Sequence, residues 1–228
     1  TEGMKLCLSQ IRMYKRMLQS ILKIGLPAGF EAIMYSISNI IVQVSINNFG
    51  VDTMAAWTAY SKIDFIFWMI NSAFGISVMT FVGQNYGAGK WDRIRRGTKI
   101  CLGMALISAV SVSIILMSAE RFLFGIFVND AGVVEIGIHM MNVIAPAYLL
   151  FAFIEVFSGA LRAQGAVVVS TLITMVGICV LRMIWVTLVA AHGTLEQVII
   201  CYPITWAAGA LAMSIYYIYK QRKIFQAR

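Results

Sequence analysis

Six long apolar stretches, separated by short polar joints, constrain this chain more than any other feature of its sequence. Each stretch is about long enough to cross a hydrocarbon core of ~30 Å as a helix that rises ~1.5 Å per residue. The stretches run approximately over residues 24–47, 55–82, 100–117, 133–160, 167–191 and 198–219. Backbone polar groups in lipid need partners within the protein, and the stretches lack the alternation that is typical of strands. The sequence therefore predicts an all-α membrane protein with six transmembrane helices.

Positive charge falls on every second joint, which gives the predicted helices an orientation. Lysines and arginines cluster before the first stretch, at 90–99, at Arg162 and at 220–228, whereas the other joints contain only Arg121. Because lysine and arginine favour cytoplasmic loops, we expect both termini in the cytoplasm. Residues 1–23 form a basic, amphipathic cytoplasmic linker, either lying among headgroups or extending the first helix. Residues 24–219 form the predicted six-helix membrane domain, and residues 220–228 form a basic cytoplasmic tail.

The composition excludes several classes of protein. The chain is 60% hydrophobic and only 12% charged, and the basic flanks of membrane spans account for its net charge of +8, so we do not expect nucleic-acid binding. The 4 cysteines lack CxxC spacing, which argues against a zinc site or a disulfide framework. The HExxH, GxSxG and GxGD motifs are missing, and the run at 83–90 fails as a phosphate loop. We therefore expect neither catalysis nor a cofactor.

Polar residues at membrane depth are costly, so they are candidates for function. Counting helical rise from the cytoplasmic edges places Glu31 and Glu155 at similar depth, in the inner half, with no basic residue at that depth. An unpaired carboxylate there would attract a cation, so we expect these two residues to bind a coupling ion or a substrate. Further candidates on the first and second spans are Tyr35, Asn39, Gln43 and Asn71. Asn39 and Gln43 share one helical face and would bind either a neighbouring helix or a ligand.

The outer half contains Lys62, Asp64 and Arg182. Asp64 and Arg182 are otherwise uncompensated at similar depth, so we expect them to form an ion pair, which either locks two helices or takes part in transport. Lys62 is expected to extend its charged end outward. Pro146 interrupts the fourth span and predicts a kink there.

Glycine-rich joints on the cytoplasmic side carry the most specific motifs. We hypothesise that Gly83, Gly87 and Gly89 let the chain turn sharply where a Cβ would obstruct it. The nearby Arg93 and Arg96 would bind anionic headgroups and support closure of an inner gate.

The run FVGQNYGAGKWDRIRRG at 81–97 resembles the signature of the multidrug and toxic compound extrusion (MATE) family. The run SGALRAQG at 158–165 is similar to the second marker of that family, except that Ala163 stands where glycine is usual. Stretches at 24–50, 55–68 and 201–206 resemble the C-terminal half of bacterial members. By this resemblance the motif residues are Gly83, Gln84, Asn85, Gly87, Gly89, Arg93 and Arg96 at the cytoplasmic gate, and Gly159, Arg162 and Gly165 in the second marker.

The resemblance implies one six-helix lobe of a two-lobe transporter in the cell membrane, that of a bacterium. Such a transporter extrudes drugs or organic cations in exchange for Na⁺ or H⁺. Its partners would be the bilayer, the exported compound and an N-terminal six-helix lobe that is absent from this chain. Two alternatives remain open, a lipid-linked saccharide flippase of the same superfamily and a non-transporting six-helix membrane scaffold.

Overall fold

The computed structural model describes residues 12, 14–190 and 193–226. Its helices are α1 (Lys15–Asn47), α2 (Val51–Gly87), α3 (Trp91–Ser118), α4 (Glu120–Gly125), α5 (Ala131–Ile144), η3 (Ala145–Ala147), α6 (Tyr148–Ala163), α7 (Val167–Thr174), η4 (Met175–Val180), α8 (Leu181–Ile184), η5 (Trp185–Val189), α9 (Leu195–Ile199) and α10 (Cys201–Gln226). Among the described residues, 6 helical runs are long and apolar enough to cross a membrane. This confirms the predicted fold class.

The helices extend beyond the apolar stretches. The third span begins at Trp91 rather than at residue 100, so most of the basic joint at 90–99 is helical. Lysine and arginine form helix well, and hydropathy marks only the part of a helix that lies within the hydrocarbon. Most of the predicted linker at 1–23 lies outside the described residues, but from Lys15 onward it is continuous with the first span.

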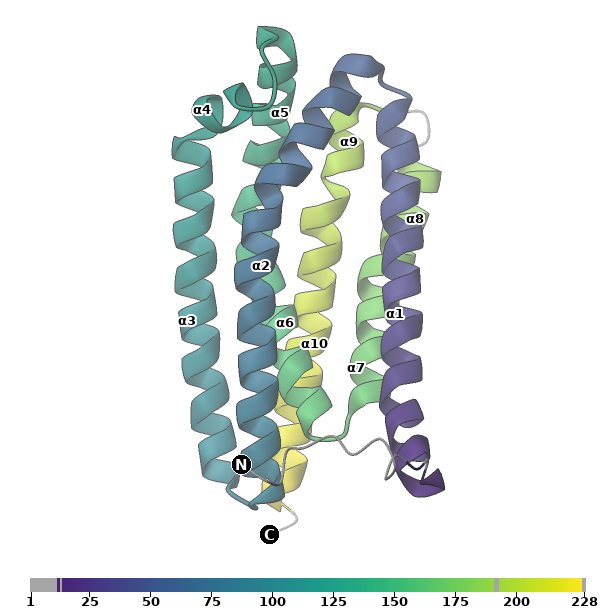
Figure 1. The fold of residues 1–228 in the computed structure, drawn as a ribbon, viewed down its shortest axis with the longest axis vertical. Helices are drawn as coiled ribbons and strands as arrows, with labels where there is room; N and C mark the ends of the chain where they lie inside the picture. The colour runs from purple at the N-terminus through teal and green to yellow at the C-terminus, as the bar shows by residue number, and fades with distance from the viewer. Residues whose placement is uncertain (1–11, 13, 191–192, 227–228) are drawn as a thin grey trace.

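The spans form a bundle in which α1 stands apart from most of the others (Figure 1). Helix α2 packs against α3, α5 and α6, and α6 also packs against α10. Helix α1 lies mainly along α7 and η4. The beginning of α1 and the end of α10 lie at one end of the bundle, together with the α2–α3 and α6–α7 turns (Figure 1). The four segments that sequence places on the cytoplasmic side therefore share one end.

Two spans are not continuous α-helices. In the fourth span, a 3₁₀ turn around Pro146 separates α5 from α6, as the proline predicts. In the fifth span, the π-helical segments η4 and η5 flank α8, which contains Arg182. Nothing in the sequence analysis predicted these π-helical turns. Pro27, by contrast, lies within α1 without ending it.

Helices α2 and α6 cross closely at two glycines. A Cβ on Gly159 would lie 2.7 Å from the carbonyl oxygen of Gly75. A Cβ on Gly75 would in turn lie 2.2 Å from the Oε1 atom of Glu155. The absence of both side chains lets the Glu155 carboxylate lie directly against the backbone of α2.

Candidate functional site

An inner cavity of about 310 Å³ lies between α1, α2, α6 and α7. Glu31 from α1 and Glu155 from α6 both line it, so the structure brings the two predicted carboxylates to one place. Its other lining residues are Tyr35, Trp68, Asn71, Ser72, Phe151, Ile154, Ser158, Arg162 and Thr174. Among these lining residues the ionisable acidic and basic groups are two carboxyl groups and one guanidinium, so the acidic groups outnumber the basic one.

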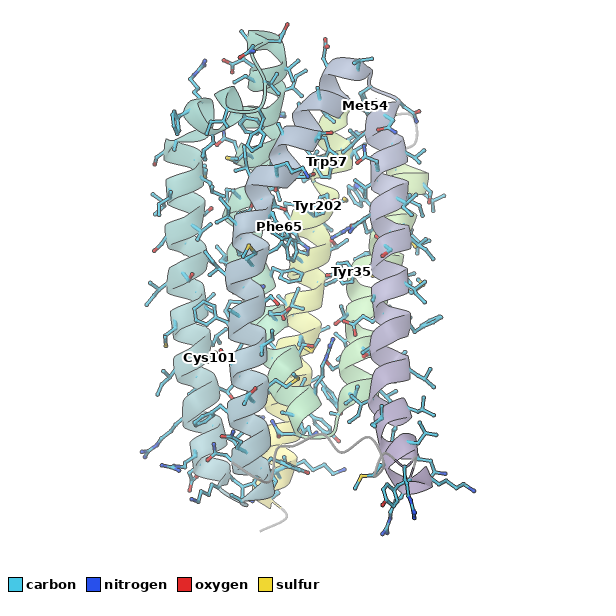
Figure 2. All side chains as sticks on the ribbon, in the orientation of Figure 1. Tyr35, Met54, Trp57, Phe65, Cys101 and Tyr202 are labelled. Carbon is cyan, nitrogen blue, oxygen red and sulfur yellow. The ribbon has the colours of Figure 1, made fainter. Side chains whose placement is uncertain are left out.

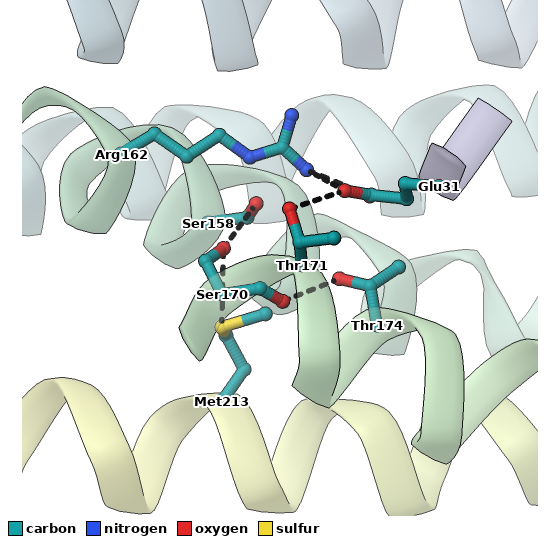
Figure 3. A network of polar contacts seen from close by, with 7 residues as sticks. All are labelled: Glu31, Ser158, Arg162, Ser170, Thr171, Thr174 and Met213. Carbon is teal, nitrogen blue, oxygen red and sulfur yellow. Dashed lines mark hydrogen bonds and ion pairs between the residues drawn. The ribbon is translucent and has the colours of Figure 1, made fainter. Parts of the chain in front are cut away.

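Glu31 is paired, contrary to the expectation that no cation lies at its depth. The Nη2 atom of Arg162 donates to both Glu31 carboxylate oxygens, at 2.7 and 2.8 Å. The Oγ1 atom of Thr171 donates to Glu31 Oε2 at 2.9 Å (Figure 3). The depth estimate failed because helical rise locates only the backbone. The long Arg162 side chain reaches from the end of α6 into the bundle.

A second set of polar contacts joins α6 to α7 beside this pair (Figure 3). The hydroxyls of Ser158 and Ser170 lie 2.9 Å apart, and Thr174 donates to the Ser170 carbonyl at 3.1 Å. These hydroxyls give α7 a polar face toward the cavity. The spacing of Ser170, Thr171 and Thr174 along one helical face is the sequence signal for these contacts.

Glu155 differs from Glu31 in its surroundings. Within the described part of the chain, no side chain or backbone group donates a hydrogen bond to Glu155. Its carboxylate instead lies beside Gly75 and opens on the inner cavity. Arg162 donates its hydrogen bonds to Glu31 and not to Glu155.

An outer cavity of about 550 Å³ lies between α1, α2, α8 and α10. Asp64 and Arg182 both line it, with aromatic side chains around them. The predicted ion pair between these two residues is wrong, because each side chain bonds other groups instead. The Asp64 carboxylate accepts hydrogen bonds from the Tyr148 hydroxyl and, at 2.5 Å, from the Trp68 indole.

Arg182 has different partners from those expected. Its Nη1 atom donates to Asn39 Oδ1 at 3.2 Å, and its guanidinium carbon lies 4.2 Å from the centre of the Tyr202 ring. Aromatic hydroxyl, indole and ring groups thus replace the opposite charge for both residues. Tryptophan and tyrosine side chains of α2, α6 and α10 supply these contacts, and their directions could not be read from the sequence.

The remaining candidates divide between the two cavities. Tyr35 lines both, Asn39 and Gln43 line the outer one, and Asn71 lines the inner one. Asn39 contacts another helix through Arg182, whereas Gln43 donates to Asn47 within α1 at 2.8 Å. Figure 2 shows Tyr35 on α1 facing the interior of the bundle, with Trp57 and Tyr202 above it.

The glycine hypothesis holds for only one position of the first motif. Gly89 has a φ of 66°, in the region that favours glycine, and it ends the turn after α2. Gly83 and Gly87 lie within α2, where an added Cβ would meet no atom closer than 4.0 Å. The atom at that distance from Gly83 is the Cβ of Ala163, so the two motifs adjoin.

The other motif residues have distinct positions. Asn85 is buried and donates to the Phe81 carbonyl at 2.8 Å, while Gln84 is exposed. Arg93 and Arg96 are exposed beside a basic surface groove of about 540 Å³. In the second motif, Gly165 has a φ of 78° at the α6–α7 turn.

Among the described residues, six helices long and apolar enough to cross a membrane, with two cavities that contain charged side chains, define a helical multi-pass membrane protein. The MatE family model matches residues 27–188. The chain therefore belongs to the MATE family, and it corresponds to one half of a family transporter.

Similarity to individual relatives supports the same family assignment. The chain is 25% identical over 219 residues to the "Probable multidrug resistance protein YoeA" of Bacillus subtilis, covering 94% of this chain and 47% of that protein. It is 22% identical over 158 residues to the human "Multidrug and toxin extrusion protein 1", and this match covers 67% of this chain and 28% of the human protein. An outward-facing MATE family transporter of the MOP superfamily has the same fold, with a TM-score of 0.86 at 16% identity, over 97% of this chain and 50% of that one. The chain spans about half the length, or less, of these relatives.

Proposed function

We propose that this chain is one lobe of a secondary efflux antiporter, which exports drugs or organic cations in exchange for Na⁺ or H⁺ by alternating access. A six-helix N-terminal lobe would complete it. The protein would lie in a bacterial plasma membrane with both ends of this chain in the cytoplasm. The family match, and the drug-export names of several relatives, support efflux rather than saccharide flipping or a scaffold.

The observation that carries the proposal is the inner cavity, with two carboxylates and one arginine. Arg162 neutralises Glu31, so Glu155 is the charge that remains to be compensated. A proton, a sodium ion or a cationic substrate would each compensate it. Competition among them for one carboxylate would couple their movements, provided that they favour different access states.

Arg162 would also connect the coupling site to the cytoplasmic motif. It lies in the second motif, next to the glycine turn at Gly165, and its side chain holds Glu31 on α1. A movement of this turn would therefore change the partner of Glu31. Glu31, released from Arg162, would become a second cation ligand beside Glu155.

The test is ion-driven transport by the complete two-lobe transporter in proteoliposomes. We expect Glu155→Gln to abolish substrate movement against its gradient, because the amide cannot bind or release the coupling cation. Glu31→Gln should reduce it to a smaller extent. The matched control is Glu135→Gln, which removes a carboxylate from an exposed surface pair and should leave transport unchanged. Full uphill transport by the Glu31→Gln, Glu155→Gln double variant would place the coupling site outside the inner cavity.

A further inference from the structure

The outer cavity contains hydrogen-bond donors that have no partner. The Nε and Nη2 atoms of Arg182, the indole nitrogen of Trp206 and the hydroxyl of Tyr35 are all buried and unbonded. All three side chains line this one cavity. Arg182 and Trp206 are each only 1% exposed, and both offer donors alone. A buried donor without an acceptor is costly, so this set is complementary to an acceptor-rich group such as a carboxylate.

The local backbone at Arg182 also departs from regular structure. Its short helix α8 lies between the two π-helical segments η4 and η5. Single π-helical turns inside α-helices occur frequently at functional sites. A purely structural arginine would be expected to have a carboxylate partner, because a buried unpaired charge is costly. The carboxylate in the same cavity, Asp64, bonds Trp68 and Tyr148 instead.

The charge and shape of the outer cavity together limit the class of ligand that it can bind. Arg182 and Asp64 put opposite charges on the wall of one cavity without pairing with each other. A purely cationic ligand would leave Arg182 without an opposite charge, and a purely anionic one would leave Asp64 without one. Aromatic rings surround both groups, with Trp57 and Tyr202 at 5.9 Å and Tyr202 and Trp206 at 5.5 Å between ring centroids. The volume of about 550 Å³ is that of a small-molecule pocket.

We propose that the outer cavity binds aromatic zwitterions, with the ligand carboxylate on Arg182 and its protonated amine toward Asp64. Trp57, Trp68, Tyr202 and Trp206 would contact the flat ring between them. This inference rests on the proposed transport function only in taking the bound compound to be an exported one. Binding and transport are therefore measured separately.

The experiment is equilibrium dialysis of three tritiated compounds against the two-lobe transporter in nanodiscs. The first is a naphthalene that bears a carboxylate and a primary amine, the second is its methyl ester, and the third is the acid without the amine. The unmodified protein should bind the zwitterion most tightly. Arg182→Gln should raise the Kd of both acids by about tenfold or more and leave that of the ester unchanged.

Asp64→Asn supplies the reciprocal result. It should raise the Kd of the two amines and leave that of the amine-free acid unchanged. This crossed pattern separates loss of a ligand contact from misfolding, because a misfolded variant would lose all three compounds alike. Equal binding of zwitterion and ester by the unmodified protein would overturn the proposal. So would a uniform loss in a variant that keeps the melting temperature of the unmodified protein.

Two further outcomes have distinct meanings. Zwitterion binding no tighter than ester binding, together with a chloride-dependent rise in melting temperature that Arg182→Gln lacks, would assign Arg182 to an inorganic anion and overturn the proposal. The crossed binding pattern without any ion-driven transport would support this inference and contradict the antiporter function.

Discussion

Arg162 is the residue on which the inner cavity depends most. Its guanidinium bonds both oxygens of Glu31, and the two side chains are only 28% and 11% exposed. Removing one partner of a buried pair leaves the other charge without compensation, which costs about 3–5 kcal/mol when burial is complete. The exposed pair Arg121–Glu135, at 74% and 55%, is the internal comparison, because such surface pairs contribute about 0–1 kcal/mol.

We therefore expect Arg162→Gln to lower the free energy of unfolding by about 2–3 kcal/mol, somewhat below the value for complete burial. Arg121→Gln should change it by less than about 1 kcal/mol. The double variant Arg162→Gln, Glu31→Gln should be more stable than the sum of the two single losses predicts. Thermal unfolding in detergent measures the unmodified protein, the three single variants Arg162→Gln, Glu31→Gln and Arg121→Gln, and the double variant. Strict additivity would mean that the two residues do not act as a pair.

Helix α6 connects the two cavities to the cytoplasmic turn. Tyr148 at its start bonds Asp64 of the outer cavity, Glu155 opens on the inner cavity, and Arg162 near its end bonds Glu31. The close approach of α6 to α2 at Gly159 fixes the position of all three side chains. The 3₁₀ turn around Pro146 lies just before this helix and separates it from α5.

A Gly159→Ala substitution tests the importance of this crossing. The new Cβ would lie 2.7 Å from the Gly75 carbonyl oxygen and would push α6 away from α2. We expect a loss of about 1–3 kcal/mol in stability and reduced transport, as for other overpacked interiors. Gly103→Ala in α3 is the control, because its Cβ would meet nothing within 4 Å and alanine favours helix. Normal stability of Gly159→Ala would show that the helices separate at little cost.

The bundle has two distinct ends. The basic segments at the starts of α1 and α3 and at the end of α10 lie together, and the α1–α2 loop and α4 lie at the opposite end (Figure 1). The same asymmetry of lysine and arginine that predicts orientation is thus preserved in three dimensions. The outer cavity lies toward the end with few basic residues and the inner cavity toward the basic end.

Cysteine accessibility at the two ends of α2 tests this orientation. In a variant lacking native cysteines, Asp52→Cys and Lys90→Cys place one exposed thiol at each end of the helix. A membrane-impermeant maleimide added to whole cells should label Asp52→Cys and not Lys90→Cys. Both should react after the membrane is permeabilised. Labelling of Lys90→Cys in intact cells would reverse the orientation.

The number and class of the helices could be read from the sequence, because a bilayer requires about 20 apolar residues for each crossing. The similar depth of Glu31 and Glu155 in the membrane could also be predicted from the sequence by counting helical rise, and both residues line one cavity. Pro146 gave the break in the fourth span, because a ring without an amide hydrogen cannot continue the helical bonds.

The contact partners of the charged side chains, by contrast, could not be predicted from the sequence. Glu31 is paired with Arg162 and is not left open for a cation. Asp64 accepts hydrogen bonds from Tyr148 and Trp68. Arg182 lies against the ring of Tyr202. Each of these contacts joins different helices or depends on how a long side chain is directed. Periodicity gives the position of a residue along its own helix, but the rotation of one helix against another comes from packing. The tertiary structure alone therefore decided which charges are paired and which donors remain open in the outer cavity.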